Sequence, residues 1–213
     1  MTQTVSVNTA ATSRNDAVAR QIRATLQERG ILAINLMSSP GSGKTSLLER
    51  MGERMGTALA VITGDVQMTF DADRINRSGA QAVQIETRGA CHLSAMVVQK
   101  ALSDVNLDGV RILVIENVGN LVCPAAYDLG ERFKVAMLSV AEGDEKPAKY
   151  PALFVRAAAV IVSKIDLIPY VNFDVERAER DCRALNNAVR LFRVSCTTGE
   201  GIDQWCSYLQ GAA

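Results

Sequence analysis

A short loop rich in glycine and serine lies between an apolar run and a helical stretch in the first quarter of the chain. Residues 31–37 (ILAINLM) suit a buried strand, and residues 45–55 have the composition of a helix. The loop between them, residues 38–45 (SSPGSGKT), fits the phosphate-binding pattern except that Ser38 replaces the first glycine. A strand, this loop and a helix, in that order, predict a phosphate-binding unit of an α/β fold.

The residue types in this loop suit contacts with phosphate. The two glycines let backbone N–H groups approach phosphate oxygens, and the helix N-terminus adds positive potential. Lys44 can reach the β- and γ-phosphates, and the Thr45 hydroxyl can ligate Mg²⁺. The alternative is a Gly/Ser turn that only happens to precede a helix. We expect a nucleotide to contact the following residues, of which Lys44 also acts in catalysis: Gly41, Ser42, Gly43, Lys44, Thr45 and Ser46.

The rest of the chain alternates short apolar runs with helical stretches. Further strands are expected at residues 59–63, 82–85, 111–115, 135–140, 159–162 and 191–194. Helices are expected at residues 15–29, 71–77, 93–102, 147–156 and 174–187. This alternation predicts an α/β fold of the P-loop NTPase kind, a mainly parallel sheet with helices on both faces. Without a repeat or a long linker, we expect one domain over residues 1–213, with a flexible segment at residues 1–13.

Charge and hydropathy exclude several kinds of partner. The 213 residues include 23 basic and 23 acidic side chains, so no overall basic field favours nucleic acid or an anionic membrane. No apolar run approaches the roughly 18 residues of a membrane span, and no secretory signal opens the chain. We therefore expect a cytoplasmic protein with neither a nucleic-acid nor a membrane partner. In that reducing compartment, the five cysteines suit thiols or metal ligands rather than disulfides.

Two acidic residues are candidates for holding the metal of a nucleotide site. Glu116 ends a predicted buried strand, where it could orient Mg²⁺ while the Gly119 amide senses the γ-phosphate. Asp65 follows another predicted strand and could contact Mg²⁺ or position the attacking water. Because Gly-Asp turns are common, Asp65 could equally be an ordinary turn residue. Glu116 likewise has the alternative of a solvated loop carboxylate.

Two further loops suit recognition of guanine. The Asp166 carboxylate can accept hydrogen bonds from guanine N1–H and N2–H₂, but it would meet a lone pair at adenine N1. The Lys164 stem can cover the base plane, and a backbone N–H near Ser195 and Cys196 could meet guanine O6. Each of these segments follows a predicted strand, at the edge where parallel sheets bind ligands.

Cysteine and histidine residues in two loops are candidate metal ligands. Cys91 and His92 precede a predicted helix, and Cys123 lies seven residues beyond Glu116. Thiolate and imidazole bind Ni²⁺ and Zn²⁺, but three donors do not close a structural tetrahedral site. Two chains sharing these loops across a two-fold axis would offer six donors. On spacing alone the simpler interpretation is favoured, in which the thiols are small apolar side chains and His92 is a core or capping residue.

Taken together, the motifs resemble the hydrogenase nickel-incorporation GTPases (HypB-like). These are metallochaperones among the dimerising P-loop GTPases, a group that also includes urease and cobalamin-linked accessory proteins. The resemblance covers most of residues 31–206 and is carried by SSPGSGKTSLL, GDVQ, GACHLSA, ENVGNLVCP, LSVAEGDEKPAKYP, SKIDL and TGEGIDQW. Two residues depart from the usual family pattern. Ser163 stands where the guanine motif usually has asparagine, and Met96 stands where members often have a further histidine.

The resemblance implies a low-turnover GTPase that uses GTP, GDP and Mg²⁺ and helps insert nickel into a [NiFe]-hydrogenase precursor. It implies a homodimer favoured by GTP, with a nickel-handling accessory protein and the hydrogenase large-subunit precursor as partners. By the same likeness, nickel or zinc binds Cys91, His92 and Cys123 at the dimer interface. Three alternatives stay open: an accessory GTPase for urease or a cobalamin enzyme, a P-loop kinase for a small molecule, and a module that binds GTP without hydrolysing it.

Overall fold

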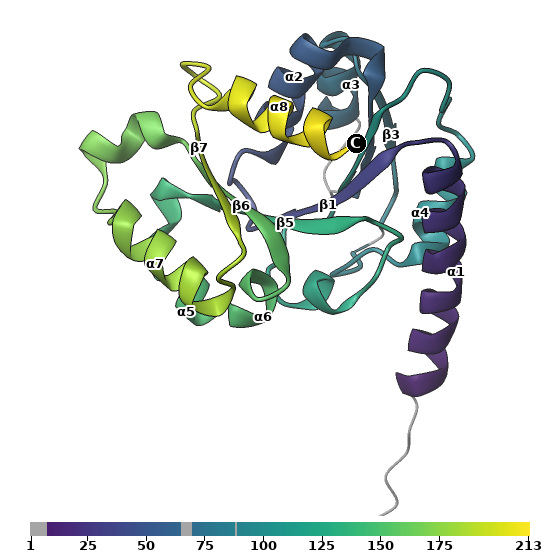
Figure 1. The fold of residues 1–213 in the computed structure, drawn as a ribbon, viewed down its shortest axis with the longest axis horizontal. Helices are drawn as coiled ribbons and strands as arrows, with labels where there is room; N and C mark the ends of the chain where they lie inside the picture. Colours follow the sequence, from purple (N-terminus) through teal and green to yellow (C-terminus); the bar gives the residue numbers. More distant parts are fainter. Residues whose placement is uncertain (1–7, 65–69, 88) are drawn as a thin grey trace, which may run out of the picture.

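The structure, a computed structural model, describes residues 8–64, 70–87 and 89–213. Over these residues seven parallel strands form one sheet in the order β3-β2-β4-β1-β5-β6-β7 (Figure 1). The strands are β1 (Leu32–Ser38), β2 (Leu59–Thr63), β3 (Gln81–Gln84), β4 (Ile112–Glu116), β5 (Phe133–Ser139), β6 (Ala157–Ser163) and β7 (Arg190–Val194). The sheet confirms the predicted fold class, and β1 lies at its centre.

Helices cover both faces of this sheet (Figure 1). They are α1 (Asn8–Glu28), α2 (Lys44–Met55), α3 (Phe70–Arg77), α4 (Ala95–Leu102), α5 (Lys146–Lys149), α6 (Pro151–Phe154), α7 (Val175–Leu185) and α8 (Ile202–Ala212). Residues of α2, α3 and α8 pack on one face, whereas residues of α1, α4, α6 and α7 pack on the other. Ile34 and Leu36 of β1 point to the first face and Ala33 to the second, which explains why the strand is apolar throughout.

Two sequence predictions differ from the structure. The helix expected over residues 147–156 is split into α5 and α6, because Tyr150 precedes a proline and leaves the helical conformation with φ −126° and ψ 51°. The helix expected over residues 15–29 begins earlier, because α1 starts at Asn8. The flexibility of residues 1–13 stays a prediction. Over the described residues, no helix is both long enough and apolar enough to span a membrane.

Each of the five inner strands ends in a buried polar residue. These residues are Ser38 of β1, Thr63 of β2, Glu116 of β4, Ser139 of β5 and Ser163 of β6, all at most 1% exposed. Parallel strands bring these residues to one edge of the sheet, next to the loop that enters α2. Parallel sheets bind ligands at the carboxyl ends of their strands, so this edge is the place to look for a binding site.

Candidate functional site

The loop between β1 and α2 folds around the hydroxyl of Ser38. Ser42 Oγ donates to Ser38 Oγ over 2.5 Å, and Lys44 Nζ donates to the same oxygen over 3.1 Å. The Ser38 hydroxyl in turn donates to the Ser39 carbonyl at 2.8 Å. Lys44 is only 5% exposed, so its ammonium is held inside the loop. The serine that departs from the phosphate-loop pattern therefore supplies a polar partner for the lysine.

Two glycines in this region are required by geometry. Gly43 has a φ of +98°, in the left-handed region, and leads directly into α2. Gly119 lies against Pro40, because a Cβ atom on Gly119 would sit 2.9 Å from Pro40 Cγ. The loop after β4 therefore touches the phosphate-binding loop, as the predicted γ-phosphate contact of Gly119 requires.

Glu116 is fully buried at the end of β4, where its neighbours in register are Leu36 of β1 and Thr63 of β2. The Gly64 N–H donates to the Glu116 carbonyl oxygen over 2.9 Å. Thr45 lies in the first turn of α2, directly after the phosphate-binding loop. Carboxylate and hydroxyl oxygens are hard donors that suit Mg²⁺. Asp65, the other predicted ligand, lies outside the described residues.

A pocket of about 190 Å³ joins the phosphate-binding loop to the predicted guanine motif. Its lining includes Ser42, Gly43, Ser46, Lys164, Asp166 and Cys196. Lys164 Nζ donates to the Gly41 carbonyl at 2.7 Å, and Ser195 Oγ donates to Asp166 Oδ1 at 2.5 Å. Among the described residues, Lys164 is the non-glycine residue with positive φ, at 60°. Such backbone strain is common at binding sites.

Ser195 contributes differently from the sequence prediction. Its N–H donates to the Glu200 carbonyl at 3.0 Å, so this amide is used within its own turn. The Ser195 hydroxyl instead orients the Asp166 carboxylate, and it also accepts from the Thr198 N–H at 3.1 Å. A contact between the Cys196 N–H and guanine stays a prediction. The Cys196 carbonyl oxygen accepts a hydrogen bond from Arg50 Nε at 2.8 Å.

Ser195→Ala is expected to weaken GTP binding about five- to tenfold, the net worth of about one hydrogen bond. Without the hydroxyl, the Asp166 carboxylate loses the donor that fixes its orientation. Isothermal titration with GTP measures the change, and Ser207→Ala, an exposed position on α8, is the matched control. Unchanged affinity in Ser195→Ala would contradict a base-binding role for the oriented Asp166.

Two residues at this edge have roles that the sequence did not indicate. The Ser163 hydroxyl donates to the Ser42 carbonyl at 2.8 Å, so it ties the end of β6 to the phosphate-binding loop. Lys146 Nζ donates to Ser39 Oγ at 2.9 Å and forms an ion pair with Glu142 at 3.3 Å. Both contacts join segments more than 100 residues apart, and only the position of β5 and β6 beside β1 brings them together.

The predicted metal ligands lie together on one surface. Cys91 is exposed and its Sγ lies 3.3 Å from His92 Nδ1. A hydrogen bond with Cys123, which begins a short 3₁₀ helix, raises the pKa of Cys91. The His92 ring stacks on Tyr127 with centroids 3.9 Å apart, and partial burial lowers the pKa of this imidazole. Met96, at the position of a frequent family histidine, is exposed nearby in sequence on α4.

These side chains do not form a complete metal centre within the chain. No group of three or more Cys, His, Asp or Glu side chains is arranged to hold a metal ion in the part of the chain that the structure describes. The His92 ring stacks on Tyr127, and its Nδ1 faces Cys91 Sγ. The candidate metal ligands therefore contact one another two at a time. A site shared between two chains stays a prediction.

The remaining cysteines suit structural roles. Burial raises the pKa of Cys182 to about 12 and that of Cys206 to about 11, so both are protonated thiols near neutral pH. Cys182 packs on α7 in the core beside β6, and Cys206 packs on α8 against the opposite face. Burial also raises the pKa of Cys196, which lines the guanine-motif pocket.

The central strand of this parallel sheet leads through a phosphate-binding loop into a helix. This arrangement defines the class of P-loop nucleoside triphosphatases. The comparisons with known proteins agree with this class. A family model described as CobW/HypB/UreG, nucleotide-binding domain matches residues 32–193. The crystal structure of HypB from Helicobacter pylori in complex with nickel superposes with a TM-score of 0.88 at 38% identity, covering 93% of this chain and 94% of that one.

Two curated relatives extend the match along the chain. Hydrogenase maturation factor HypB of Escherichia coli strain K12 is 47% identical over 199 residues, which cover 92% of this chain and 69% of that protein. Hydrogenase/urease maturation factor HypB of Helicobacter hepaticus is 43% identical over 194 residues, covering 89% and 80%. The chain belongs to the CobW/HypB/UreG family, and within it to the HypB maturation factors.

Proposed function

We propose that this protein is a GTP-hydrolysing metallochaperone that helps insert nickel into a [NiFe]-hydrogenase precursor. The observation that carries the proposal is the pocket in which the phosphate-binding loop meets Lys164 and Asp166, in a chain of the HypB group. Nickel as the cargo is supported by the nickel complex of the H. pylori relative. We place the protein in the cytoplasm as one GTPase domain over residues 1–213, acting with a nickel-handling accessory protein and without nucleic acid or membrane.

The residues at the sheet edge would support slow GTP hydrolysis. Lys44 would leave Ser38 and neutralise the β- and γ-phosphates, while Asp166 would select guanine. Thr45 and Glu116, with Asp65, would hold Mg²⁺, which supplies further charge neutralisation when bound. Gly119 would donate its N–H to the γ-phosphate. Within the described residues Lys44 is the cationic side chain that we assign to the γ-phosphate, and a site with one such cation is expected to turn over slowly.

We further propose that the nucleotide controls dimerisation and the metal-binding surface. GTP would favour a homodimer, because contacts of the γ-phosphate with Gly119 order the segment that leads to Cys123. Two chains would then share Cys91, His92 and Cys123, with nickel as the cargo and zinc as an alternative occupant. Hydrolysis would relax this segment and weaken or reshape the metal site.

A second candidate client is urease, because the H. hepaticus relative is named a hydrogenase/urease maturation factor. The chemistry of the nucleotide site is the same for both clients. Affinity capture with the tagged full chain would separate the two: recovery of a hydrogenase large subunit supports the first client and recovery of a urease subunit the second. A cobalamin-enzyme client has no such support here.

Nickel binding and oligomer mass, measured together with GDP and with a non-hydrolysable GTP analogue, test the metal part of the proposal. The wild type is expected to bind Ni²⁺ and to become dimeric with the analogue, with nickel affinity differing at least about fivefold between the two nucleotides. Cys91→Ala should lose most of the nickel binding and keep GTP hydrolysis. Absence of nickel from the wild type would overturn the metallochaperone role and leave the GTPase intact.

A further inference from the structure

Two buried asparagines hold the segment that follows His92. The Leu93 N–H donates to Asn117 Oδ1 at 3.3 Å, and the Ala95 N–H donates to Asn15 Oδ1 at 2.8 Å. Asn117 is fully buried and Asn15 is 4% exposed. Ser94, the residue between these amides, makes no capping bond with its own side chain at the start of α4. The backbone after the Cys91–His92 pair is therefore fixed from outside, by α1 and by the loop after β4.

Asn117 also belongs to the nucleotide edge. It directly follows Glu116, and its Oδ1 accepts the Val118 N–H at 3.0 Å in addition to the Leu93 N–H. The next residue, Gly119, lies against Pro40 of the phosphate-binding loop. Asn117 Oδ1 thus joins the loop after Glu116, which is predicted to contact the nucleotide, to the backbone next to His92. A carbonyl oxygen has two lone pairs, so these two bonds occupy its capacity.

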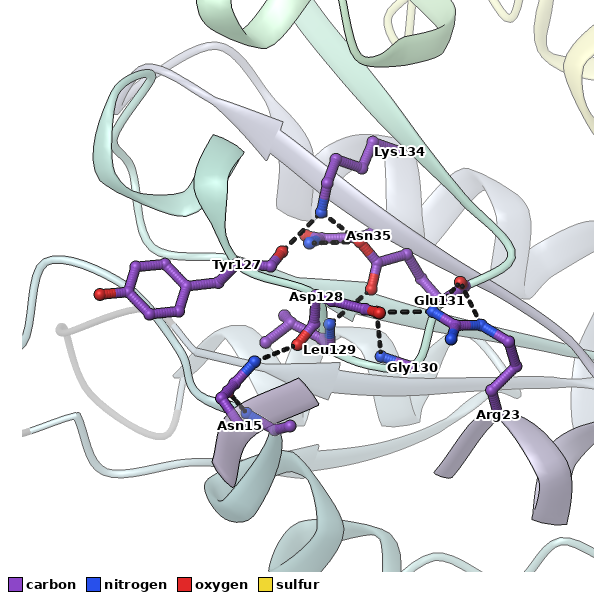
Figure 2. A network of polar contacts seen from close by, with 10 residues as sticks. Asn15, Arg23, Asn35, Tyr127, Asp128, Leu129, Gly130, Glu131 and Lys134 are labelled. Carbon is purple, nitrogen blue, oxygen red and sulfur yellow. Dashed lines mark hydrogen bonds and ion pairs between the residues drawn. The ribbon is translucent and has the colours of Figure 1, made fainter. Parts of the chain in front are cut away.

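The other end of the Asn117 side chain is anchored in the core. Asn117 Nδ2 donates to Asn35 Oδ1 at 3.2 Å, and Asn35 Nδ2 lies 3.4 Å from Glu131 Oε1. Glu131 is 5% exposed, forms an ion pair with Lys134 and accepts the Leu129 N–H at 2.7 Å. Figure 2 shows Asn35, Glu131 and Lys134 converging at this point. The nitrogen of the Asn117 side-chain amide is therefore held in place by Asn35.

The same network reaches the histidine by a second route. Lys134 Nζ donates to the Tyr127 carbonyl at 2.6 Å, and the Tyr127 ring stacks on His92. Asn15 belongs to this side, because its Nδ2 donates to the Asp128 carbonyl at 2.8 Å (Figure 2). Unlike Asn117, Asn15 bonds to the loop of residues 127–131 and not to the loop after Glu116.

We propose that Asn117 is the positioning residue through which the bound nucleotide sets the position of Cys91 and His92. A terminal phosphate would draw the Val118 and Gly119 amides toward the phosphate-binding loop. This movement would displace Asn117 Oδ1, which accepts from both the Val118 N–H and the Leu93 N–H. Because the other end of the amide is fixed by Asn35, the displacement passes to the Leu93 N–H and the backbone beside His92. This inference rests on the proposed coupling of nucleotide and metal and names the contact that transmits it.

The test compares Asn117→Ala with Asn15→Ala, since each removes the acceptor of one amide in residues 93–95 and neither residue is assigned a contact with nucleotide or metal. Ni²⁺ affinity is titrated for each full-length variant with GDP and with the non-hydrolysable GTP analogue. In Asn117→Ala the ratio of the two affinities should fall to within about twofold of one, while Asn15→Ala should keep the wild-type ratio. A wild-type ratio in Asn117→Ala, or an equal loss in both variants, would overturn the proposal.

A measurement on the wild type does not depend on how the variants fold. Hydrogen exchange of the Leu93 amide should differ at least about fivefold between the GDP and GTP-analogue states, and that of the Ala95 amide should not. Equal exchange of Leu93 in both states would refute the link even if nickel affinity responded to nucleotide. A change at Leu93 without any nickel response would support the link and refute the proposed coupling to metal. Asn117→Ser serves as the second variant if Asn117→Ala is unfolded by circular dichroism.

Discussion

Replacing Lys44 with alanine is expected to weaken GTP binding more than about a hundredfold and to abolish GTP hydrolysis. The lysine is 5% exposed and bonds to Ser38, so its ammonium lies inside the loop that would surround the phosphates. Triphosphate carries the charge that this ammonium would neutralise, and during transfer further negative charge develops on the leaving β-phosphate. Fluorescence titration with labelled GTP and single-turnover hydrolysis measure the two effects.

The control for this change is Lys100→Ala, which removes an exposed cation in the last turn of α4. It should bind and hydrolyse GTP like the wild type. Hydrolysis by the wild type without an added acceptor, and its loss in Lys44→Ala, would exclude a small-molecule kinase as the main activity. If Lys44→Ala hydrolysed GTP at the wild-type rate, the phosphate-binding loop would not be the catalytic site.

The strands could be predicted closely because their signal is local. Each of the seven predicted strands overlaps a strand of the structure and differs from it by at most two residues at each end. A central strand of a parallel sheet is apolar on both faces, as in residues 31–37, and this pattern is visible without knowledge of its neighbours. The break at Tyr150 was missed because helical composition on both sides of the proline masked the restriction that Pro151 imposes.

The polar contacts of the site could be predicted only in part, because they depend on strand order. Glu116 ends β4, and Lys44 and Asp166 lie in motifs that follow β1 and β6, so the sequence itself marks all three. Other contacts of the site join distant segments: Ser195 bonds to Asp166 across 29 positions, and Ser163 bonds to Ser42 in the phosphate-binding loop across 121. Nothing in the residue pattern states that β5 and β6 follow β1 in the sheet, and therefore these tethers appear only in the structure.

The cysteine and histidine residues illustrate a different limit. Sequence adjacency shows that Cys91 and His92 are neighbours, and the fold brings Cys123 into contact with Cys91. His92 stacks on Tyr127, and the Leu93 N–H donates to Asn117. These are tertiary contacts, and the spacing of residues along the sequence does not predict them. The chemistry of the donors could thus be predicted, whereas the way the fold holds them could not.

Asp166→Asn is expected to weaken GTP binding about a hundredfold, equivalent to about 2.7 kcal/mol. The Asp166 carboxylate would accept from both guanine N1–H and the 2-amino group, and Ser195 holds it in one orientation. With an amide in its place, one accepting oxygen is replaced by an NH₂ group, which would face the 2-amino group donor to donor. One bond is lost and one donor is left buried without a partner.

The same substitution should reverse the preference between guanine and xanthine. Xanthine carries an oxygen at position 2, which can accept from the introduced amide, while its N1–H still donates to the remaining oxygen. Competition binding of xanthosine triphosphate against GTP should therefore favour the xanthine nucleotide in Asp166→Asn and GTP in the wild type. Asp104→Asn, at an exposed position, is the matched control. Equal losses for both nucleotides would mean that Asp166 supports the pocket without reading the base.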